Sequence, residues 1–377
     1  MGINKYINNR LRLVNLLPDS DAILIVGNGS VIRTSDTSYP FRQDSNILYF
    51  TGIEVPSISL FIDVKNYKSF IVVPRQNRTE IIFEGETNSQ KIIDISGCED
   101  VIGYDDLINR LKACKNIYSN LPAPNRVNGS FNNGFRRQVY PRLVRNNIKT
   151  KDIRPVLANL RMIKQDYEIN DIKKAVNITK KTLKTIEPLI WQKNQTEQSL
   201  AWAITAEFAK HKAGHGYSPI VATGPNASTL HINPGKNMIS NSVLFDVGAE
   251  YNGYSADISR TYFKQNSDLY KSLAEVQSSI IDIVRPGILF KDIHKFAVSQ
   301  IADLACKFNL NEPIESLFPH SIGHHLGLDT HDLADYKNPL QENMIITIEP
   351  GIYSKQKGFG MRIEDDILVT GNGSLVL

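Results

Sequence analysis

Short apolar segments alternate with a helical one in the first part of the chain. Residues 104–115 (YDDLINRLKACK) place Leu107, Ile108 and Leu111 at helical spacing, on one face of a predicted helix. Three other segments are dense in Ile, Val and Phe and are predicted strands: residues 22–27 (AILIVG), 59–64 (SLFIDV) and 69–74 (SFIVVP). This alternation predicts a mixed α/β domain.

Beyond this domain the pattern changes to amphipathic helices followed by strands. Residues 163–189 have the apolar spacing of one long helix, interrupted by a proline near its end. Thr196 is a suitable N-cap for a second helix, with Glu197 favourably placed in its first turn. The segments that follow are predicted strands and loops (217–262), two helices (267–285 and 290–308) and glycine-rich strands. We therefore expect two domains, residues 1–157 and 158–377.

Composition places the chain of 377 residues among ordinary globular proteins. Hydrophobic residues make up 41% and charged residues 22%, which argues against disorder. The net charge of +4 arises from 43 basic and 39 acidic residues without a basic block, so no nucleic-acid partner is expected. The three cysteines form no CxxC pair, which gives no sign of a thiolate zinc site and favours a reducing compartment. Without a signal-peptide pattern or an apolar run of ~20 residues, we expect a cytoplasmic protein that binds no membrane.

Four of the eight histidines lie in one short stretch, residues 320–332 (HSIGHHLGLDTHD). Histidine is the commonest side-chain metal ligand and the usual proton carrier near neutral pH. No glutamate lies between the histidines, so the His-Glu-x-x-His helix of zinc proteases is excluded. Gly323 and Gly327 also disfavour a helix here. Any further metal ligands must therefore come from elsewhere in the chain.

Residues 243–262 (VLFDVGAEYNGYSADISRTY) contain a predicted hairpin with two aspartates. Asn252-Gly253 between apolar segments is a strong signal for a two-residue turn. With that turn, Asp246 and Asp257 point to the same face as diagonal neighbours, about 7–8 Å apart at the backbone. Carboxylates that converge in this way repel each other unless a cation joins them. The alternatives are two solvated aspartates, or a three-residue loop that places the two on opposite faces.

Two glutamates are associated with apolar strands near the carboxyl end. Glu349 ends the strand in residues 343–353 (NMIITIEPGIY), just before a Pro-Gly pair. Glu364 lies inside the strand in residues 359–370 (FGMRIEDDILVT). Buried carboxylates need partners, so both positions are candidates for a metal site. The alternative for each is a glutamate that faces solvent.

The motifs around these residues occur in the order DVGAEYNGYSAD, GHHLGLDTHD, TIEPGIY and RIEDDILVT. This order and spacing resembles the pita-bread metallopeptidases, and aminopeptidase P most of all. Residues 41–52 (FRQDSNILYFTG) are similar to the amino-terminal domain of aminopeptidase P and prolidase, so the resemblance covers essentially the whole chain. It implies an α/β (α+β) fold, with a mixed α/β creatinase-like domain at residues 1–157 and a catalytic pita-bread domain at residues 158–377.

The resemblance implies a dinuclear metal centre formed by five side chains. Asp246 would bind one metal ion, and Asp257 and Glu364 would bridge both ions. His324 and Glu349 would complete the shell of the second ion, and Glu349 would also pass protons during catalysis. Four carboxylates and one imidazole make a hard, oxygen-rich shell that suits manganese. Two divalent cations would balance the charge of the four carboxylates.

The resemblance also implies roles at the substrate site. His231 (in STLHINP), His320 and His331 fall on positions that line this site. His231 and His331 would orient the peptide and stabilise the tetrahedral intermediate. Arg362 would hold the site carboxylates or the substrate end, and its alternative is an ordinary surface arginine. His325 receives no catalytic role and is expected to be a packing or partly exposed histidine.

The function implied by the resemblance is that of a metallo-aminopeptidase, a hydrolase that cleaves the bond between an amino-terminal residue and a following proline in peptides. Prolidase, which cleaves X-Pro dipeptides, is the close alternative because it shares both domains and all five ligands. An inactive peptide-binding pita-bread module is the alternative from another class. Such modules usually lose metal ligands, and creatinase lacks the metals, whereas this sequence retains all five ligands. Because relatives form dimers or tetramers, a homodimer or homotetramer is expected.

Overall fold

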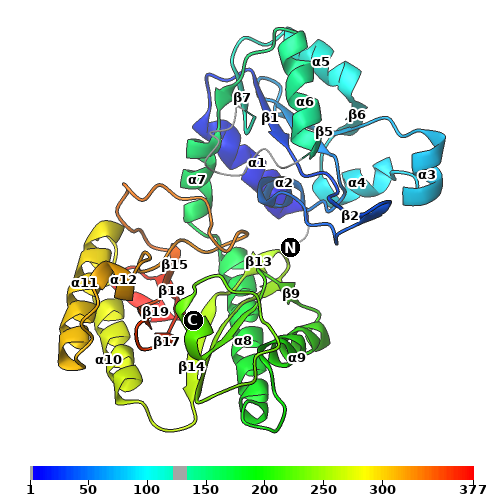
Figure 1. Ribbon diagram of the computed structural model, residues 1–377. Coiled ribbons are helices and arrows are strands. Elements are labelled where there is room, and N and C mark those ends of the chain that lie inside the picture. The colour runs from blue at the N-terminus through cyan, green and yellow to red at the C-terminus, as the bar shows by residue number, and fades with distance from the viewer. Residues whose placement is uncertain (1–2, 122–133) are drawn as a thin grey trace. The chain divides into compact units, whose positions relative to one another are not determined.

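The computed structural model describes residues 3–121 and 134–377 (Figure 1). The chain divides into two compact units, Met1–Leu160 and Arg161–Leu377, each of which combines helices with β-sheet. The fold is therefore α/β (α+β), as predicted. The division falls inside helix α7 (Arg154–Met162), close to the boundary expected after residue 157. Within the described ranges, no helix is both long and apolar enough to cross a membrane.

The first unit is built on a six-stranded sheet in the order β6-β5-β4-β1-β7-β8. Its strands are β1 (Ala22–Val26), β4 (Ser59–Asp63), β5 (Lys68–Val73), β6 (Asp100–Gly103), β7 (Ile117–Ser119) and β8 (Lys151–Asp152), with a separate hairpin of β2 (Ile32–Thr34) and β3 (Thr37–Ser38). Its helices before α7 are α1 (Asn4–Leu16), α2 (Ser45–Thr51), α3 (Arg78–Glu84), α4 (Ser89–Ser96), α5 (Tyr104–Lys112) and α6 (Gly134–Arg145). One sheet face packs against α5 and α6 through buried Leu24, Leu107 and Val139. The three predicted strands and the predicted helix are confirmed.

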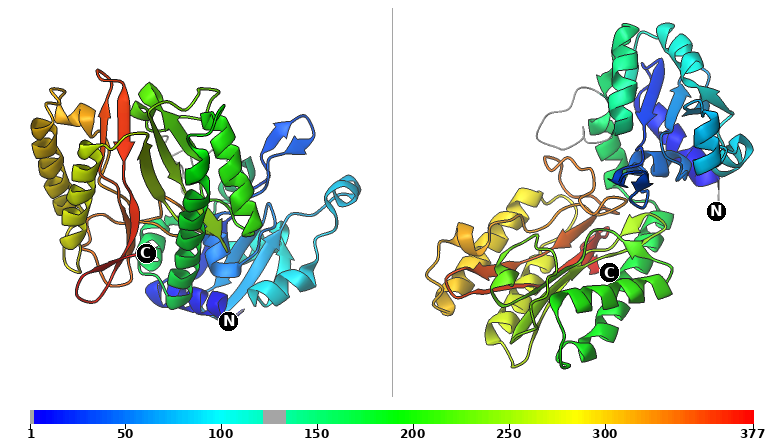
Figure 2. Two further views of the ribbon diagram at one scale, coloured as in Figure 1. Left: turned by 90° about the horizontal axis from the view of Figure 1, so that it is seen from below. Right: turned by 45° about the vertical axis from the view of Figure 1, so that its right-hand side comes forward.

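The second unit consists of short sheets flanked by helices. Its helices are α8 (Asp166–Ile186), η2 (Glu187–Leu189), α9 (Glu197–Lys210), η3 (Gly224–Ser228), α10 (Asp268–Asp282), α11 (Phe290–Lys307) and α12 (Ile314–Leu317). Its strands are β9 (Gly214–His215), β10 (Ile220–Thr223), β11 (Ser242–Val247), β12 (Ala249–Tyr251), β13 (Tyr254–Ser255), β14 (Ile258–Phe263), β15 (Ile345–Ile348), β16 (Gly351–Ser354), β17 (Phe359–Arg362), β18 (Asp365–Val369) and β19 (Ser374–Val376). Figure 2 shows the green pair α8 and α9 along one group of strands, and the yellow pair α10 and α11 beside the other.

Local capping determines where helices α8 and α9 begin. The long predicted helix starts later than expected, after Gln165, because Ile163 instead forms a β-bridge with Met344. Helix α9 begins after Thr196, as predicted, and the Thr196 and Ser199 side chains each accept the other's backbone N–H. These two bonds satisfy two of the backbone N–H groups at the start of α9.

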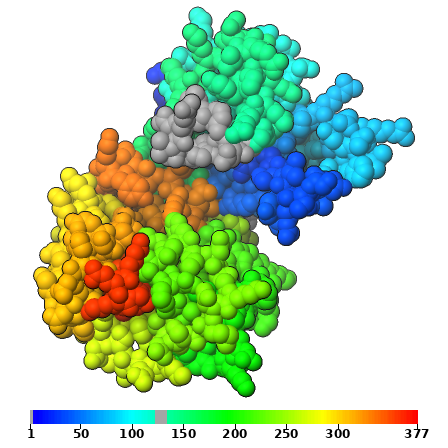
Figure 3. All heavy atoms as spheres, in the orientation of Figure 1, coloured from blue at the N-terminus to red at the C-terminus, as the bar shows by residue number. Residues whose placement is uncertain are grey.

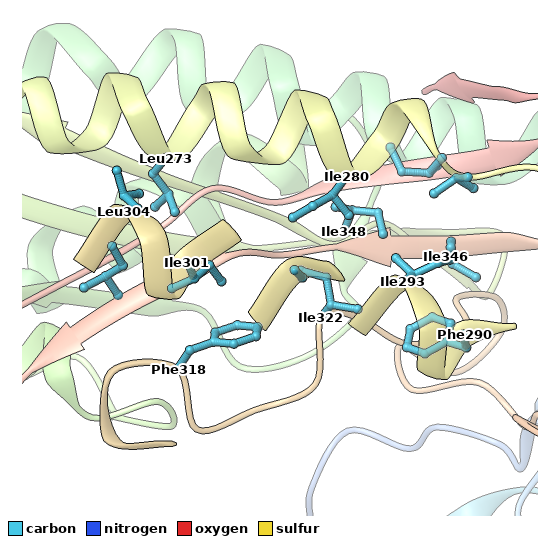
Figure 4. Close-up of a cluster of buried hydrophobic side chains, with 14 of the residues drawn as sticks. Leu273, Ile280, Phe290, Ile293, Ile301, Leu304, Phe318, Ile322, Ile346 and Ile348 are labelled. Carbon is cyan, nitrogen blue, oxygen red and sulfur yellow. The ribbon is translucent and has the colours of Figure 1, made fainter. Parts of the chain in front are cut away.

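An apolar core packs the carboxyl-terminal strands against helices α10 and α11. Ile346 and Ile348 of β15 are fully buried between α10 and α11 (Figure 4). The facing side chains, all fully buried, are Leu273, Ile280, Ile293 and Ile301. The same core reaches Ile322, within the histidine-rich stretch. This packing holds the segments before and after Glu349 on a rigid base.

The predicted aspartate hairpin is confirmed in its register. Tyr251 pairs with Tyr254 across the two-residue turn, where Asn252 and Gly253 have φ of 50° and 82°. Farther along, Asp246 of β11 pairs with Ser259 of β14. Because this register keeps the alternation of side chains intact, the side chains at 246 and 257 lie on the same face.

The strand β17 passes unusually close to η3, and this contact can be tested. A Cβ atom added at Gly360 would lie 1.8 Å from the Ala227 carbonyl oxygen. Gly360→Ala should therefore lower the free energy of unfolding by roughly 1–3 kcal/mol, the usual cost of overpacking. Gly373→Ala is the control, since nothing lies within 4 Å of a Cβ there. Equal denaturant midpoints for the two variants would contradict the close contact.

Candidate metal centre

Four carboxylates from four chain segments converge in the second unit. Asp246 lies on β11, Asp257 lies between β13 and β14, Glu349 follows β15, and Glu364 lies between β17 and β18. Asp257 is 5% exposed and Glu364 is 1% exposed, and the side chains of Asp246 and Glu349 are only 12% and 16% exposed. The interpretation of these residues as solvated side chains is therefore wrong.

His324 faces this carboxylate cluster. Its Nε2 atom lies 3.3 Å from Asp257 Oδ2 and 3.7 Å from Glu349 Oε1. Its Nδ1 lies 3.1 Å from the His325 carbonyl oxygen, a contact that leaves Nε2 directed at the acidic side chains. Ligand atoms of Asp257, His324 and Glu364 all lie within 4.8 Å of one another, a spacing suited to a metal ion. The structure thus brings together the histidine and the carboxylates that the sequence analysis predicted as metal ligands.

The Tyr217 hydroxyl lies between the two aspartates of the hairpin. It is 2.5 Å from Asp246 Oδ1 and 2.6 Å from Asp257 Oδ1. A phenol can donate only one proton, so the second short oxygen–oxygen contact requires a proton on a carboxyl group or a nearby cation. Burial raises the pKa of Asp246. A proton on this carboxyl group would therefore explain the second short contact when no cation is present. The donor set therefore fits divalent cations.

Arg362 is part of this site and is not a surface arginine. It is 4% exposed, and it forms an ion pair with Asp246. Its Nε donates to Ser259 Oγ at 2.8 Å, and its Nη1 donates to Tyr353 Oη at 2.7 Å. Glu364 Oε2 lies 3.8 Å from the guanidinium. One permanent positive charge thus offsets part of the negative charge of the cluster.

The excess negative charge that Arg362 does not offset is reflected in the raised pKa values of neighbouring side chains. Burial raises the pKa of Glu349 to about 7 and raises that of Glu364 well above its usual range. Burial alone would lower the pKa of His324, but the adjacent Asp257 carboxylate raises it to about 9. Protonation would relieve the repulsion in this cluster in the same way as divalent cations do, and oxygen-rich sites of this kind bind hard divalent metals.

Two further histidines, His320 and His331, lie near the carboxylates and His324. His320 Nε2 makes a 2.9 Å hydrogen bond with Tyr353 Oη, and burial lowers the pKa of His320 to about 3, so its ring is neutral. The His331 ring lies 4.2 Å from the His324 ring. His231 is exposed on the loop after η3, and a charge on it would lower the pKa of both His320 and His331. The segment around residue 330, orange in Figure 3, reaches the surface at His331, which is exposed next to the buried Asp332.

His325 lies outside the cluster. It is 2% exposed, and its ring packs 5.4 Å from Tyr336 and 6.4 Å from Phe290. Its backbone forms a bridge with Ile346. Burial lowers the pKa of His325 to about 3. The structure therefore gives it the packing environment that the sequence-based interpretation expected.

Sequence reasoning missed several residues of the site. Tyr217 bridges the two aspartates, Tyr353 joins Arg362 to His320, and Asp366 accepts the Asp257 backbone N–H at 3.0 Å. Tyr353 had a weak signal, a polar-tipped side chain inside the apolar strand after Glu349. Tyr217 had none, because its contact depends on how β9 and β10 join the hairpin.

Comparison with known proteins gives two family matches. Residues 170–371 match the metallopeptidase family M24, and residues 6–120 match the aminopeptidase P amino-terminal domain. The chain is similar to human Xaa-Pro aminopeptidase 3, with 27% identity over 94% of this chain and 77% of the human protein. It is also similar to the Escherichia coli Xaa-Pro aminopeptidase, with 26% identity over 97% of this chain and 92% of that protein. A solved Bacillus anthracis structure, provisionally described as an aminopeptidase P, has a TM-score of 0.88 at 28% identity, covering 100% of this chain and 94% of that one.

The raised pKa values predict how stability depends on pH. The folded pKa of Glu349 is about 7 against a usual 4.5, and that of His324 is about 9 against 6.5. The folded state therefore holds more protons than the unfolded state, and this stabilisation is complete at low pH and is lost as pH rises through the two folded values. In chelator, the melting temperature should fall between about pH 5 and pH 9. Glu349→Gln, which does not titrate, should reduce the fall near pH 7, and an equal pH dependence in both proteins would contradict these pKa values.

Proposed function

The chain belongs to the metallopeptidase family M24, and from that premise we propose that it is an X-Pro aminopeptidase. Its reaction is hydrolysis of the peptide bond between an amino-terminal residue and a following proline. The observation that carries the proposal is the buried convergence of Asp257, His324 and Glu364 with two further carboxylates, beside His320 and His331. The similarity to Xaa-Pro aminopeptidases along almost the whole chain supports the same conclusion.

The proposed metal ligands are the five residues nominated by the sequence. Asp246 would hold one divalent ion, Asp257 and Glu364 would be ligands of both ions, and His324 and Glu349 would complete the ligand set of the second ion. When bound, such ions lower the pKa of a water molecule and polarise a carbonyl oxygen. Manganese is the proposed metal because the donor set is hard and oxygen-rich. Two divalent ions would also supply the positive charge that Arg362 alone does not.

The protein side chains then orient the peptide and move the protons. Glu349 accepts a proton from water and returns it to the proline nitrogen as the bond breaks. His331 and His231 donate hydrogen bonds to the carbonyl as it becomes tetrahedral. Burial lowers the pKa of His331, which keeps a neutral donor there. Arg362 holds Asp246 in place, and His320 lines the site through its contact with Tyr353.

Aminopeptidase P is favoured over prolidase. The Xaa-Pro aminopeptidases of human and Escherichia coli match this chain in both units, and the amino-terminal match is to the aminopeptidase P domain. An inactive peptide-binding module is disfavoured because all five ligand positions are retained. The substrates we propose are peptides with proline at position two. The homo-oligomeric state and the cytoplasmic location stay predictions.

The decisive assay compares two substrates on manganese-loaded protein. We expect cleavage of an X-Pro-Y tripeptide after its first residue, loss of activity in excess chelator, and recovery when manganese is restored. Cleavage of the X-Pro dipeptide alone would identify a prolidase. Full activity in protein shown by elemental analysis to hold no metal would contradict the metal centre.

The role of His331 separates a substrate-site residue from a ligand. His331→Ala should reduce turnover by roughly 10²–10³, the usual effect of removing a preorganised donor, while metal content stays near normal. His324→Ala is the matched comparison and should lose metal. If His331→Ala loses metal as well, His331 is a ligand, and if turnover is unchanged it only packs beside the site.

A further inference from the structure

Glu197 is a buried carboxylate that the proposed reaction does not use. It lies in the first turn of α9 with no exposed surface. Its Oε1 accepts hydrogen bonds from the Thr223 backbone N–H and from Asn226 Nδ2, both at 2.9 Å. Its Oε2 accepts from the Gly235 backbone N–H at 3.1 Å and from Asn237 Nδ2 at 3.2 Å. These four donors match the four lone-pair sites of a carboxylate.

The four donors come from the two ends of one loop. This loop, residues 223–237, starts at the end of β10, passes through η3 and carries His231. Backbone hydrogen bonds reinforce the closure, from Glu197 N–H to the Asn237 carbonyl at 3.1 Å and from Gln198 N–H to the Gly235 carbonyl at 2.9 Å. The start of α9 therefore closes the loop through both its backbone and the Glu197 side chain.

The middle of the loop is held on its other side. Ala227 is buried in a small apolar cluster with Leu244, and Ile232 packs against the same cluster. The Ala227 carbonyl lies against Gly360 in β17, the strand that ends at Arg362. His231 directly precedes Ile232, so an exposed side chain is carried on an anchored backbone.

We propose that Glu197 is a positioning residue that pins both ends of the loop 223–237 and thereby holds His231 at the substrate site. The assignment rests on the proposed function, since it acts through the role of His231. Beyond η3 the loop has little regular structure, so without the carboxylate its ends would separate and its conformational entropy would rise. A displacement of about 1 Å of a substrate-orienting group costs up to ~100-fold in rate.

The first half of the test measures the loop itself and requires no activity. Glu197→Gln keeps the size of the side chain but presents an amide donor to the N–H groups, and Glu197→Asp keeps the charge on a shorter side chain. Hydrogen exchange in the manganese-loaded full chain should accelerate about tenfold in residues 223–237 of Glu197→Gln, with Glu197→Asp intermediate. The control is Glu207→Gln on the same helix, which weakens the ion pairs with Lys210 and His211 and should leave the loop unchanged.

The second half is a double-mutant cycle with His231→Ala. Glu197→Gln should lower kcat/KM by up to ~100-fold in the wild-type background, with metal content unchanged. In the His231→Ala background the same change should cost no more than about twofold, because the side chain being positioned is already gone. A residue that only stabilised the fold would cost the same factor in both backgrounds.

The outcomes distinguish this inference from the proposed function. Unchanged exchange in the loop, acceleration spread through the whole second unit, or equal kinetic losses in the two backgrounds would each overturn the role of Glu197. If the wild-type chain cleaves no X-Pro peptide, the proposed function fails, and the exchange comparison still decides whether Glu197 pins the loop.

Discussion

Repulsion between Asp246, Asp257, Glu349 and Glu364 is the constraint on which the second unit depends. Four carboxylates this close and this shielded from water cannot all be ionised without positive charge among them. Arg362 supplies one charge, and protons or divalent cations supply the rest. The carboxylates stay together because their segments are fixed elsewhere, by the hairpin register and by the isoleucine core of α10, α11 and β15. The apolar packing of this unit therefore holds an electrostatically unfavourable arrangement in place.

The adjacent His324 and His325 show how strongly position decides chemistry. Successive side chains of an extended segment point in opposite directions, so one ring faces the carboxylates and the other enters the apolar layer. The Asp257 carboxylate outweighs burial and raises the pKa of His324 to about 9, whereas burial, together with the charges of Lys164 and His324, lowers that of His325 to about 3. One ring is thus a charged partner or a ligand, and its neighbour is a neutral packing group.

The local part of the site was predictable from the sequence, and the long-range part was not. The Asn252-Gly253 turn and the alternation of the strands were sufficient to place Asp246 and Asp257 on one face, because hairpin register is set locally. Whether Arg362 was buried stayed open, since burial depends on which strands meet. Tyr217 and the inward orientation of Glu197 depend on contacts between segments far apart in sequence. For Glu197 the sequence suggested a favourable helix-start charge, whereas the structure shows that its side chain also binds a distant loop.

The two-residue turn at Asn252 and Gly253 also restricts how this chain can vary in length. Surface turns usually accept inserted residues at little cost, because they lie outside the packed core. Here an insertion of one residue would shift the register and send one aspartate to the opposite face of the hairpin. Functional relatives should therefore keep this turn at constant length while differing in composition, whereas the turn between β18 and β19, which bears no such residue, is free to grow.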